Sequence, residues 1–197
     1  MQDIVIENLC KAYEGKPVLD RFSATLSAGS ITGLMAPSGA GKTTLLRLLM
    51  GLETPDSGTI TGLAGVRLSA VFQEDRLCEN LSAVSNIRLV NPARSVQEVE
   101  RALDLVGLAD ASRQPARELS GGMRRRVAIL RALLADYDFL LLDEPFKGLD
   151  KATKEIVMAD TRQRIRGRTV LFVTHDASEL DALGVRETLS LPAYGRA

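Results

Sequence analysis

Short apolar runs alternate along this chain with stretches of helical periodicity, a pattern that favours an α/β sheet protein. Strands are predicted where the apolar residues run together, or alternate imperfectly with polar ones before a turn. The predicted strands are Ile4–Leu9, Pro17–Leu26, Ile31–Met35, Val66–Phe72, Phe139–Leu142 and Thr169–Val173.

Helices are predicted where leucines and other apolar residues recur at helical spacing. The first is Lys42–Leu49, which Gly51 ends. Three more lie close together between two predicted strands. We therefore expect one domain over residues 1–197 with a helical insert at about 74–136. The remaining predicted helices are Leu81–Val90, Val96–Val106, Gly121–Leu134, Lys151–Ile165 and Ala177–Leu183.

A glycine-rich loop between the third strand and the first helix has the context that a phosphate-binding loop requires. Small residues let successive backbone N–H groups curl around phosphate oxygens, and the helix N-terminus adds a partial positive charge. Lys42 can place its ammonium on the β- and γ-phosphates, and the Thr43 hydroxyl can ligate Mg²⁺. The predicted ATP-binding residues of this loop are Pro37, Ser38, Gly39, Ala40, Gly41, Lys42, Thr43 and Thr44.

Ala36 departs from the full phosphate-loop pattern, which opens with glycine. Alanine fits if this position has a negative φ, whereas a left-handed angle would cost about 1–2 kcal/mol. A glycine-rich turn before a core helix is the alternative interpretation of the loop.

An apolar strand that ends in Asp143 and Glu144 is the second chemical element. Parallel α/β folds place a carboxylate beside Mg²⁺ in this way. Asp143 would orient the metal, and Glu144 could act as general base toward the attacking water. A strand end followed by a turn is the alternative. The glycine loop about 100 residues earlier favours the catalytic interpretation.

A third element, Ser120, Gly121 and Gly122 after Leu119, opens a predicted helix with a serine N-cap. A hydroxyl and free N–H groups at a helix N-terminus form a second anion site. Because this Leu-Ser-Gly-Gly lies between the other two elements, it resembles the signature motif of ATP-binding cassette (ABC) ATPases. The resemblance covers the chain from Ile4 to about Leu191.

The resemblance implies an α/β fold built on a P-loop NTPase core, in which a mainly parallel sheet is flanked by helices. It adds a small N-terminal antiparallel β subdomain and an α-helical subdomain. It also implies ATP and Mg²⁺ as cofactors, and hydrolysis of ATP to ADP and phosphate coupled to transmembrane transport.

Further site residues follow from the family pattern. Tyr13 matches the aromatic residue that stacks on adenine, and His175 resembles the switch histidine that contacts the γ-phosphate. Gln73 resembles the glutamine that touches Mg²⁺ and the attacking water, and Asp150 resembles the aspartate of the loop that crosses to a partner subunit. The implied catalytic residues are Glu144, His175, Gln73 and Lys42. The implied metal residues are Thr43, Gln73 and Asp143.

The family pattern also implies partners. Two cassettes dimerise head to tail, so Ser120–Gly122 of one copy would meet ATP bound by the other, and a homodimer is expected. Residues after Gln73 and the helix Leu81–Val90 would receive a short helix of an integral membrane permease. The stretch Phe72–Leu77 resembles importers of the nitrate/sulfonate/taurine type, which work indirectly with a solute-binding protein. We expect the chain on the cytoplasmic, inner face of the membrane.

Charge and hydrophobicity along the chain argue against nucleic-acid binding, secretion and a membrane-spanning segment. Lys+Arg and Asp+Glu are both 25, so the net charge is zero and no global field attracts nucleic acid. The one dense basic run, Arg124–Arg126, is too short to change that prediction. The chain opens without a secretory signal, and its longest nearly uncharged apolar run, Phe139–Leu142, is far below the roughly 20 residues that span a bilayer.

Two alternatives stay open at this point. The first is a non-transport cassette acting in division, repair or translation. The second is a nucleotide-binding regulatory protein without meaningful catalysis. Ala36 and Met123 favour this alternative, because Met123 occupies a position where glutamine is common in the family. Phe146-Lys147-Gly148 departs as well, since Ser-Ala is more usual in the crossing loop.

Overall fold

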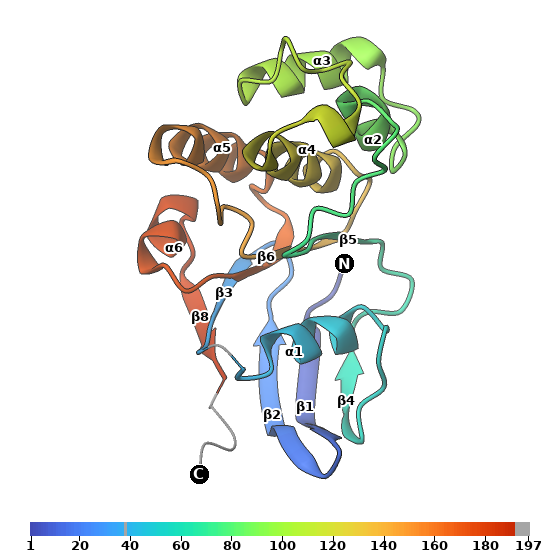
Figure 1. Ribbon diagram of the computed structural model, residues 1–197. Helices are drawn as coiled ribbons and strands as arrows, with labels where there is room; N and C mark the ends of the chain where they lie inside the picture. Colours follow the sequence, from blue (N-terminus) through green and yellow to red (C-terminus); the bar gives the residue numbers. More distant parts are fainter. Residues whose placement is uncertain (38, 192–197) are drawn as a thin grey trace.

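The computed structural model describes residues 1–37 and 39–191 and shows two sheets with helices between and above them (Figure 1). The strands are β1 (Ile4–Tyr13), β2 (Lys16–Leu26), β3 (Ile31–Met35), β4 (Ser57–Thr61), β5 (Leu68–Val71), β6 (Phe139–Asp143), β7 (Thr169–Val173) and β8 (Glu187–Ser190). The helices are α1 (Lys42–Leu49), α2 (Ala83–Arg88), α3 (Val96–Leu105), a 3₁₀ turn (Ala116–Glu118), α4 (Gly121–Leu133), α5 (Lys151–Arg164) and α6 (Ala177–Leu183).

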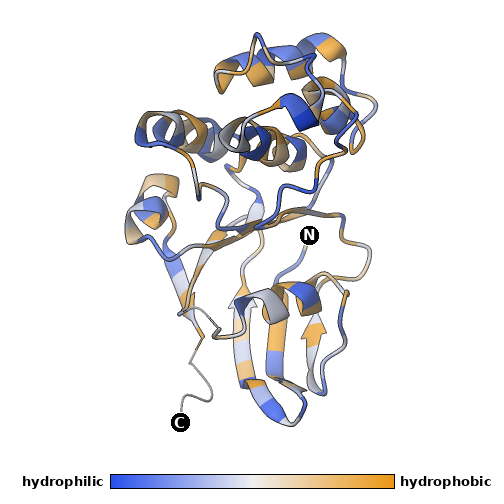
Figure 2. Cartoon of the chain, viewed as in Figure 1, coloured by the Kyte–Doolittle hydropathy of each residue, from blue (hydrophilic) through white to orange (hydrophobic). Residues whose placement is uncertain are grey.

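The larger sheet has the strand order β5-β6-β7-β3-β8, and all its neighbouring strands are parallel. Every residue of β6 and β7 is buried, which explains their continuous apolar runs. Their side chains alternate between two cores. Phe139 and Leu141 pack with α1 on one face, whereas Leu140 and Leu142 pack with α4 and α5 on the other. Strand β6 accordingly has the colour of hydrophobic residues in Figure 2.

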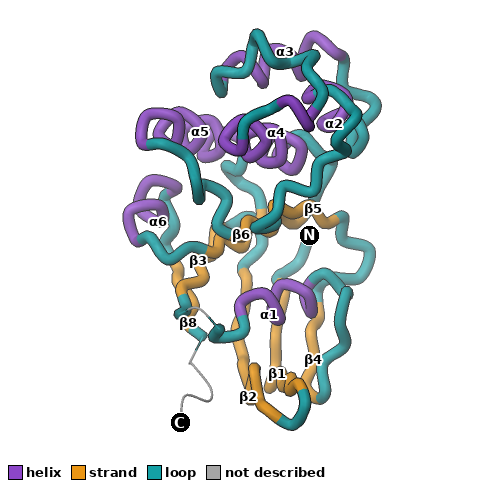
Figure 3. The backbone as a smooth tube through the Cα atoms, in the orientation of Figure 1, coloured by secondary structure: helices purple, strands orange, loops and turns teal. Residues whose placement is uncertain are grey.

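The smaller sheet is antiparallel, with the order β2-β1-β4. Its apolar residues, among them Ile4, Leu9 and Leu26, pack in one cluster with the leucines of α1 and with the near face of the parallel sheet. Helix α1 therefore lies between the two sheets (Figures 1 and 3), and the loop that precedes it is held from both sides. The predicted antiparallel subdomain is confirmed.

The helices α2, α3 and α4 all lie in the chain between β5 and β6, and they gather beyond one face of the parallel sheet (Figure 3). A buried polar residue organises their start. Asn86 of α2 accepts from the Cys78 N–H at 2.8 Å and donates to the carbonyls of Cys78, Leu81 and Ser82. A fully satisfied buried amide of this kind specifies a single arrangement of the connecting loop.

The structure differs from the sequence prediction in four places. Strands β4 and β8 were not predicted, because β4 is short and begins inside a turn-like segment, and both lie at a sheet edge. Strand β1 continues past the predicted end to Tyr13, through two register shifts against β2 that follow Leu9. Helix α2 begins two residues later than predicted because the Ser82 side chain caps it, accepting from the Ser85 N–H, and it ends at Arg88 rather than at Val90. No helix in the described ranges is long and apolar enough to cross a membrane.

Candidate functional site

The glycine loop runs from the carboxyl end of β3 to α1, as the sequence predicts. Gly41, the residue before α1, has a φ of 90°, and a Cβ there would lie 2.8 Å from Val18 Cγ1 and 3.0 Å from the Val18 carbonyl. Both the backbone angle and the close approach of β2 therefore require glycine. Gly39 also has a positive φ, of 82°. The predicted residue Ser38 lies outside the described residues.

Lys42 turns back over its own loop. Its Nζ donates to the Ala36 carbonyl at 2.7 Å and to the Pro37 carbonyl at 3.0 Å. Ala36 itself is not among the described non-glycine residues with positive φ, and its methyl group packs against the core around α1. The left-handed strain considered for alanine is therefore absent at this position, and the loop keeps its shape without the first glycine.

Asp143 ends β6 and is buried, with 5% of its surface exposed. Burial raises the pKa of this carboxyl, and the neighbouring Glu144 raises it further. Its Oδ1 has no hydrogen-bond partner among the described residues, although a buried carboxylate oxygen normally requires one. Gln73 lies within hydrogen-bonding reach of the same carboxyl, and Thr43 and Gln73 line a hollow with it. This oxygen-rich set fits a hard cation such as Mg²⁺.

Glu144 has a φ of 45° and is buried, with 8% of its surface exposed. Its backbone N–H donates to the Val173 carbonyl, which fixes the turn after β6 against β7. The Lys147 Nζ lies 3.0 Å from Glu144 Oε2, and the His175 Nδ1 lies 3.4 Å from Oε1. Burial alone would raise the pKa of Glu144, but Lys147 and His175 together hold it below its ordinary value.

A cavity of about 480 Å³ joins these elements, a volume suited to a small ligand. Tyr13 lies at its edge, 40% exposed, with its hydroxyl donating to Glu53. The cavity lining brings together residues that are widely separated in sequence. They are Tyr13, Val18, Gly39, Gly41, Lys42, Thr43, Thr44, Gln73, Glu144 and Lys147.

The signature residues lie elsewhere. Ser120 caps α4 and accepts from the Met123 N–H at 3.3 Å, and in the described chain neither it nor the glycines after it line the cavity. A Cβ added at Gly121 would meet no atom within 4 Å. Asp150 caps α5, accepting from the Thr153 N–H, and it too is outside the cavity lining. One chain therefore brings together the phosphate loop and the carboxylates, but not these residues.

Arg125 is the residue that sequence reasoning missed. Its buried guanidinium donates to the carbonyls of Pro145, Phe72, Gln73, Asp143 and Glu144, and it lies 3.2 Å from the Asp75 carboxylate. It thus ties α4 to both loops that carry the candidate metal and water-activating groups. Its spacing from Ala128 and Ile129 on the buried side of α4 could have indicated its burial.

The flanking arginines are also engaged inside the protein. Arg124 pairs with Glu79 at 2.6 Å, and Arg126 donates to the Val106 carbonyl at 2.6 Å. The arginines of the basic run therefore form hydrogen bonds and ion pairs within the protein.

The chain resembles known proteins over most of its length. Residues 19–147 match the family model described as ABC transporter. The chain is 39% identical to an aliphatic sulfonates import ATP-binding protein of Burkholderia cenocepacia, over 94% of this chain and 73% of that protein. It is 41% identical to another such protein of Rhodococcus jostii, over 90% of this chain and 74% of that protein.

Other relatives have different described roles, including a Nod factor export ATP-binding protein of Cupriavidus metallidurans, 34% identical over 90% of this chain and 64% of that protein. Among solved structures, an ATP-bound bacterial Atm1-family ABC exporter superposes with a TM-score of 0.85 and 27% identity, over 98% of this chain and 37% of that one. The predicted fold is thus confirmed. The chain belongs to the ABC transporter family, as an ATP-binding protein that hydrolyses ATP.

Proposed function

We propose that the cavity holds Mg·ATP and that residues 1–197 work as one ABC ATPase domain, with 74–136 as its helical insert. The observation that carries this proposal is the meeting of the glycine loop, which follows β3, with Asp143 and Glu144 at the carboxyl end of β6, a parallel strand of the same sheet that is separated from β3 by β7.

The residues divide the chemistry between them. Lys42 and the loop of residues 37–44, Ser38 included, bind the phosphates, with the backbone N–H groups of residues 38–44 as donors, and the Tyr13 ring stacks on adenine. Thr43, Asp143 and Gln73 hold Mg²⁺, which neutralises phosphate charge when it is bound. Glu144 accepts a proton from the attacking water, while His175 orients the γ-phosphate.

The site is completed by a second copy of this chain. Ser120, Gly121 and Gly122 present a hydroxyl and a helix N-terminus to the outside, and no described residue lies close enough to require glycine at position 121. A partner's phosphates would satisfy these donors. Asp150 begins α5 directly after the Glu144 loop, which suits it to contact the other copy.

Outside the nucleotide cavity, the helical insert offers a docking surface for a permease. Leu89 and Val90, directly after α2, are exposed by 54% and 45%. Leu52, exposed by 63%, lines with Phe72 and Arg76 the outer part of the hollow that also contains Thr43, Gln73 and Asp143. Exposed apolar side chains of this kind suit contact with a helix from a membrane protein. We propose import of an organic sulfonate or a related small anion, because the sulfonate importers align over most of both chains. The chain would then act at the cytoplasmic face.

The test is hydrolysis of Mg·ATP by the full chain. Glu144→Gln should abolish phosphate release while ATP binding persists, because the amide keeps the shape of the side chain but cannot take a proton. Glu155→Gln, an exposed residue of α5, is the matched control and should hydrolyse normally. Unchanged hydrolysis in Glu144→Gln would remove Glu144 from the role of base.

Metal dependence is checked separately. Removal of Mg²⁺ by a chelator should stop hydrolysis, and Asp143→Asn should raise the Mg²⁺ concentration needed for half-maximal rate by about tenfold or more. A rate that is independent of Mg²⁺ would contradict the metal assignment.

A further inference from the structure

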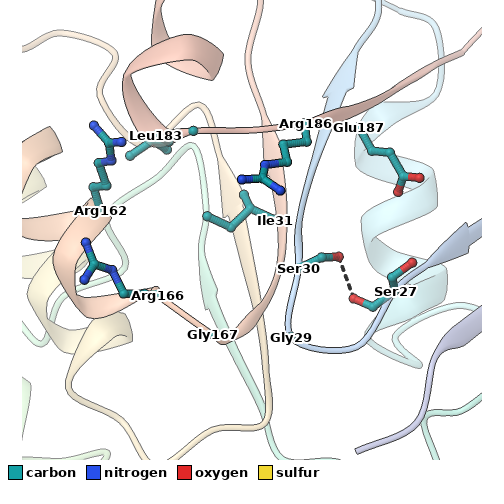
Figure 4. Close-up of a pocket in the computed structure, with 11 residues that line it drawn as sticks. Ser27, Gly29, Ser30, Ile31, Arg162, Arg166, Gly167, Leu183, Arg186 and Glu187 are labelled. Carbon is teal, nitrogen blue, oxygen red and sulfur yellow. Dashed lines mark hydrogen bonds between the residues drawn. The ribbon is translucent and has the colours of Figure 1, made fainter.

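A second hollow, of about 600 Å³, is shown in Figure 4. It lies at the amino-terminal ends of the parallel strands, whereas the nucleotide cavity lies at their carboxyl ends. Its lining residues lie next to the first residues of β3, β7 and β8. The glycine loop, Gln73 and Glu144 instead come after the last residues of their strands, on the opposite side of the sheet. Ile31 and Leu183 give the second hollow an apolar floor, and Ser27, Gly29, Ser30 and Gly167 add turns around it.

Three arginines surround this hollow: Arg162, Arg166 and Arg186. They come from the last turn of α5, the turn before β7 and the start of β8. None of the three has a hydrogen bond or an ion pair within the described chain, whereas every other described arginine has at least one such partner. Those partnered arginines are Arg21, Arg47, Arg67, Arg76, Arg88, Arg94, Arg101, Arg113, Arg117, Arg124, Arg125, Arg126, Arg131, Arg164 and Arg168.

The residues that the structure describes do not neutralise the charge of these three arginines. Glu187 lines the same hollow but makes no ion pair with a described arginine, and in Figure 4 its carboxylate points away from the three guanidinium groups. The carbonyl end of α5 accounts for a cation at Arg162, because it lies in the last turn. The carbonyl end of α5 does not account for Arg186, because Arg186 lies directly before β8 and not in that helix. Cations grouped around one concave surface repel one another until an anion joins them.

We propose that this hollow binds a small soluble polyanion that carries two or more phosphate groups. Guanidinium groups pair with phosphate oxygens in a bidentate geometry, and several around one hollow match several phosphates. The volume lies in the range of small-molecule sites, and its concave shape with an apolar floor suits an organic phosphate better than a flat lipid surface does. The inference does not depend on which solute is transported or on the identity of the general base.

The experiment is calorimetric titration of tripolyphosphate into the full chain with saturating ADP, which occupies the nucleotide cavity. We expect saturable binding that weakens by about tenfold in Arg162→Gln and in Arg186→Gln, since each substitution removes one charge-assisted pair. Arg113→Gln is the matched control, because Arg113 is 81% exposed and lies far from the hollow in a pair with Glu100. Hydrolysis of ATP should be unchanged in all three variants, which also shows that they are folded.

Two results would overturn the proposal. One is the absence of saturable heat, or binding that is equal in the Arg162, Arg186 and Arg113 variants. The other is a chain that does not bind tripolyphosphate but binds phosphatidylglycerol vesicles, with the vesicle binding lost in the Arg186 variant. The hollow would then be a lipid-facing surface. Loss of ATP hydrolysis in the wild-type chain would instead count against the proposed function and leave tripolyphosphate binding as a separate result.

Discussion

At the scale of single residues, the contact between Lys147 and Glu144 has a direct functional consequence. Both Glu144 oxygens face a cationic or hydrogen-bonding partner, Lys147 on one side and His175 on the other. A carboxylate that accepts a proton from water needs one oxygen free for that water. Lys147 is the partner that can leave, because its side chain is 64% exposed and also lines the nucleotide cavity.

Lys147→Ser should therefore raise the kcat of ATP hydrolysis by about threefold or more, since Glu144 loses a competing partner and becomes a stronger base. Steady-state phosphate release over a range of Mg·ATP concentrations gives both kcat and KM. Lys147→Arg keeps the cation and should behave like the wild type, and Lys151→Ser controls for loss of an exposed lysine nearby. A kcat that stays the same or falls in Lys147→Ser would show that the contact does not restrain the base.

At the scale of elements, Arg125 is the side chain of α4 that contacts both catalytic loops, while Arg131 of the same helix donates to the carbonyls of Asp75 and Arg76 in the loop after β5. Its guanidinium satisfies carbonyls that follow β5 and β6, and it has a carboxylate partner in Asp75. The side chain is 6% exposed, so water cannot replace these bonds. Arg125→Met should lower the free energy of unfolding by about 3 kcal/mol or more, because it leaves several buried acceptors and a carboxylate without a donor.

Urea unfolding at neutral pH measures this loss, and Arg113→Met, at an exposed position, should change the free energy of unfolding by no more than about 0.5 kcal/mol. ATP hydrolysis should also fall in the Arg125 variant, because the Gln73 and Glu144 backbones lose a common support. A stability equal to that of the wild type would mean that the loops are held by other contacts.

At the scale of the whole molecule, many carboxylates have lowered pKa values, so stability depends on pH. A hydrogen bond from Ser178 and then the Lys154 pair hold the pKa of Asp176 at about 2, and Arg67 holds that of Asp138 well below its usual range. The unfolded chain, whose carboxyls are ordinary, binds protons first as the pH falls. The stabilisation is thus present above about pH 4 and is lost progressively toward pH 2.

The urea midpoint should accordingly decrease between pH 5 and pH 3, and the decrease should be smaller for Asp176→Asn, which has no carboxyl to titrate. Because these groups are at the surface, added salt should also reduce the decrease. Asp143 acts in the opposite direction, since its raised pKa makes the folded chain take up that proton first. A midpoint that is constant down to pH 3 would show that the surface pairs contribute nothing to stability.

The sequence by itself determined the features that depend on neighbouring residues. The apolar runs Phe139–Leu142 and Thr169–Val173 predicted buried strands, and the small residues before Lys42 predicted a loop that turns into a helix. These are properties of a few consecutive positions, so no knowledge of distant contacts was required. The family resemblance then ordered the motifs and led to Tyr13, Gln73 and His175, which no local pattern identifies.

Only the tertiary structure decided which groups meet. Arg125 and the loop after β5 are about 50 residues apart in sequence, and His175 reaches Glu144 only because β6 and β7 are adjacent. The unpartnered arginines around the second hollow are likewise defined by what lies near them in space. Local propensity does not contain such pairings, because burial and charge at a site are set by the packing of the sheets and helices around it.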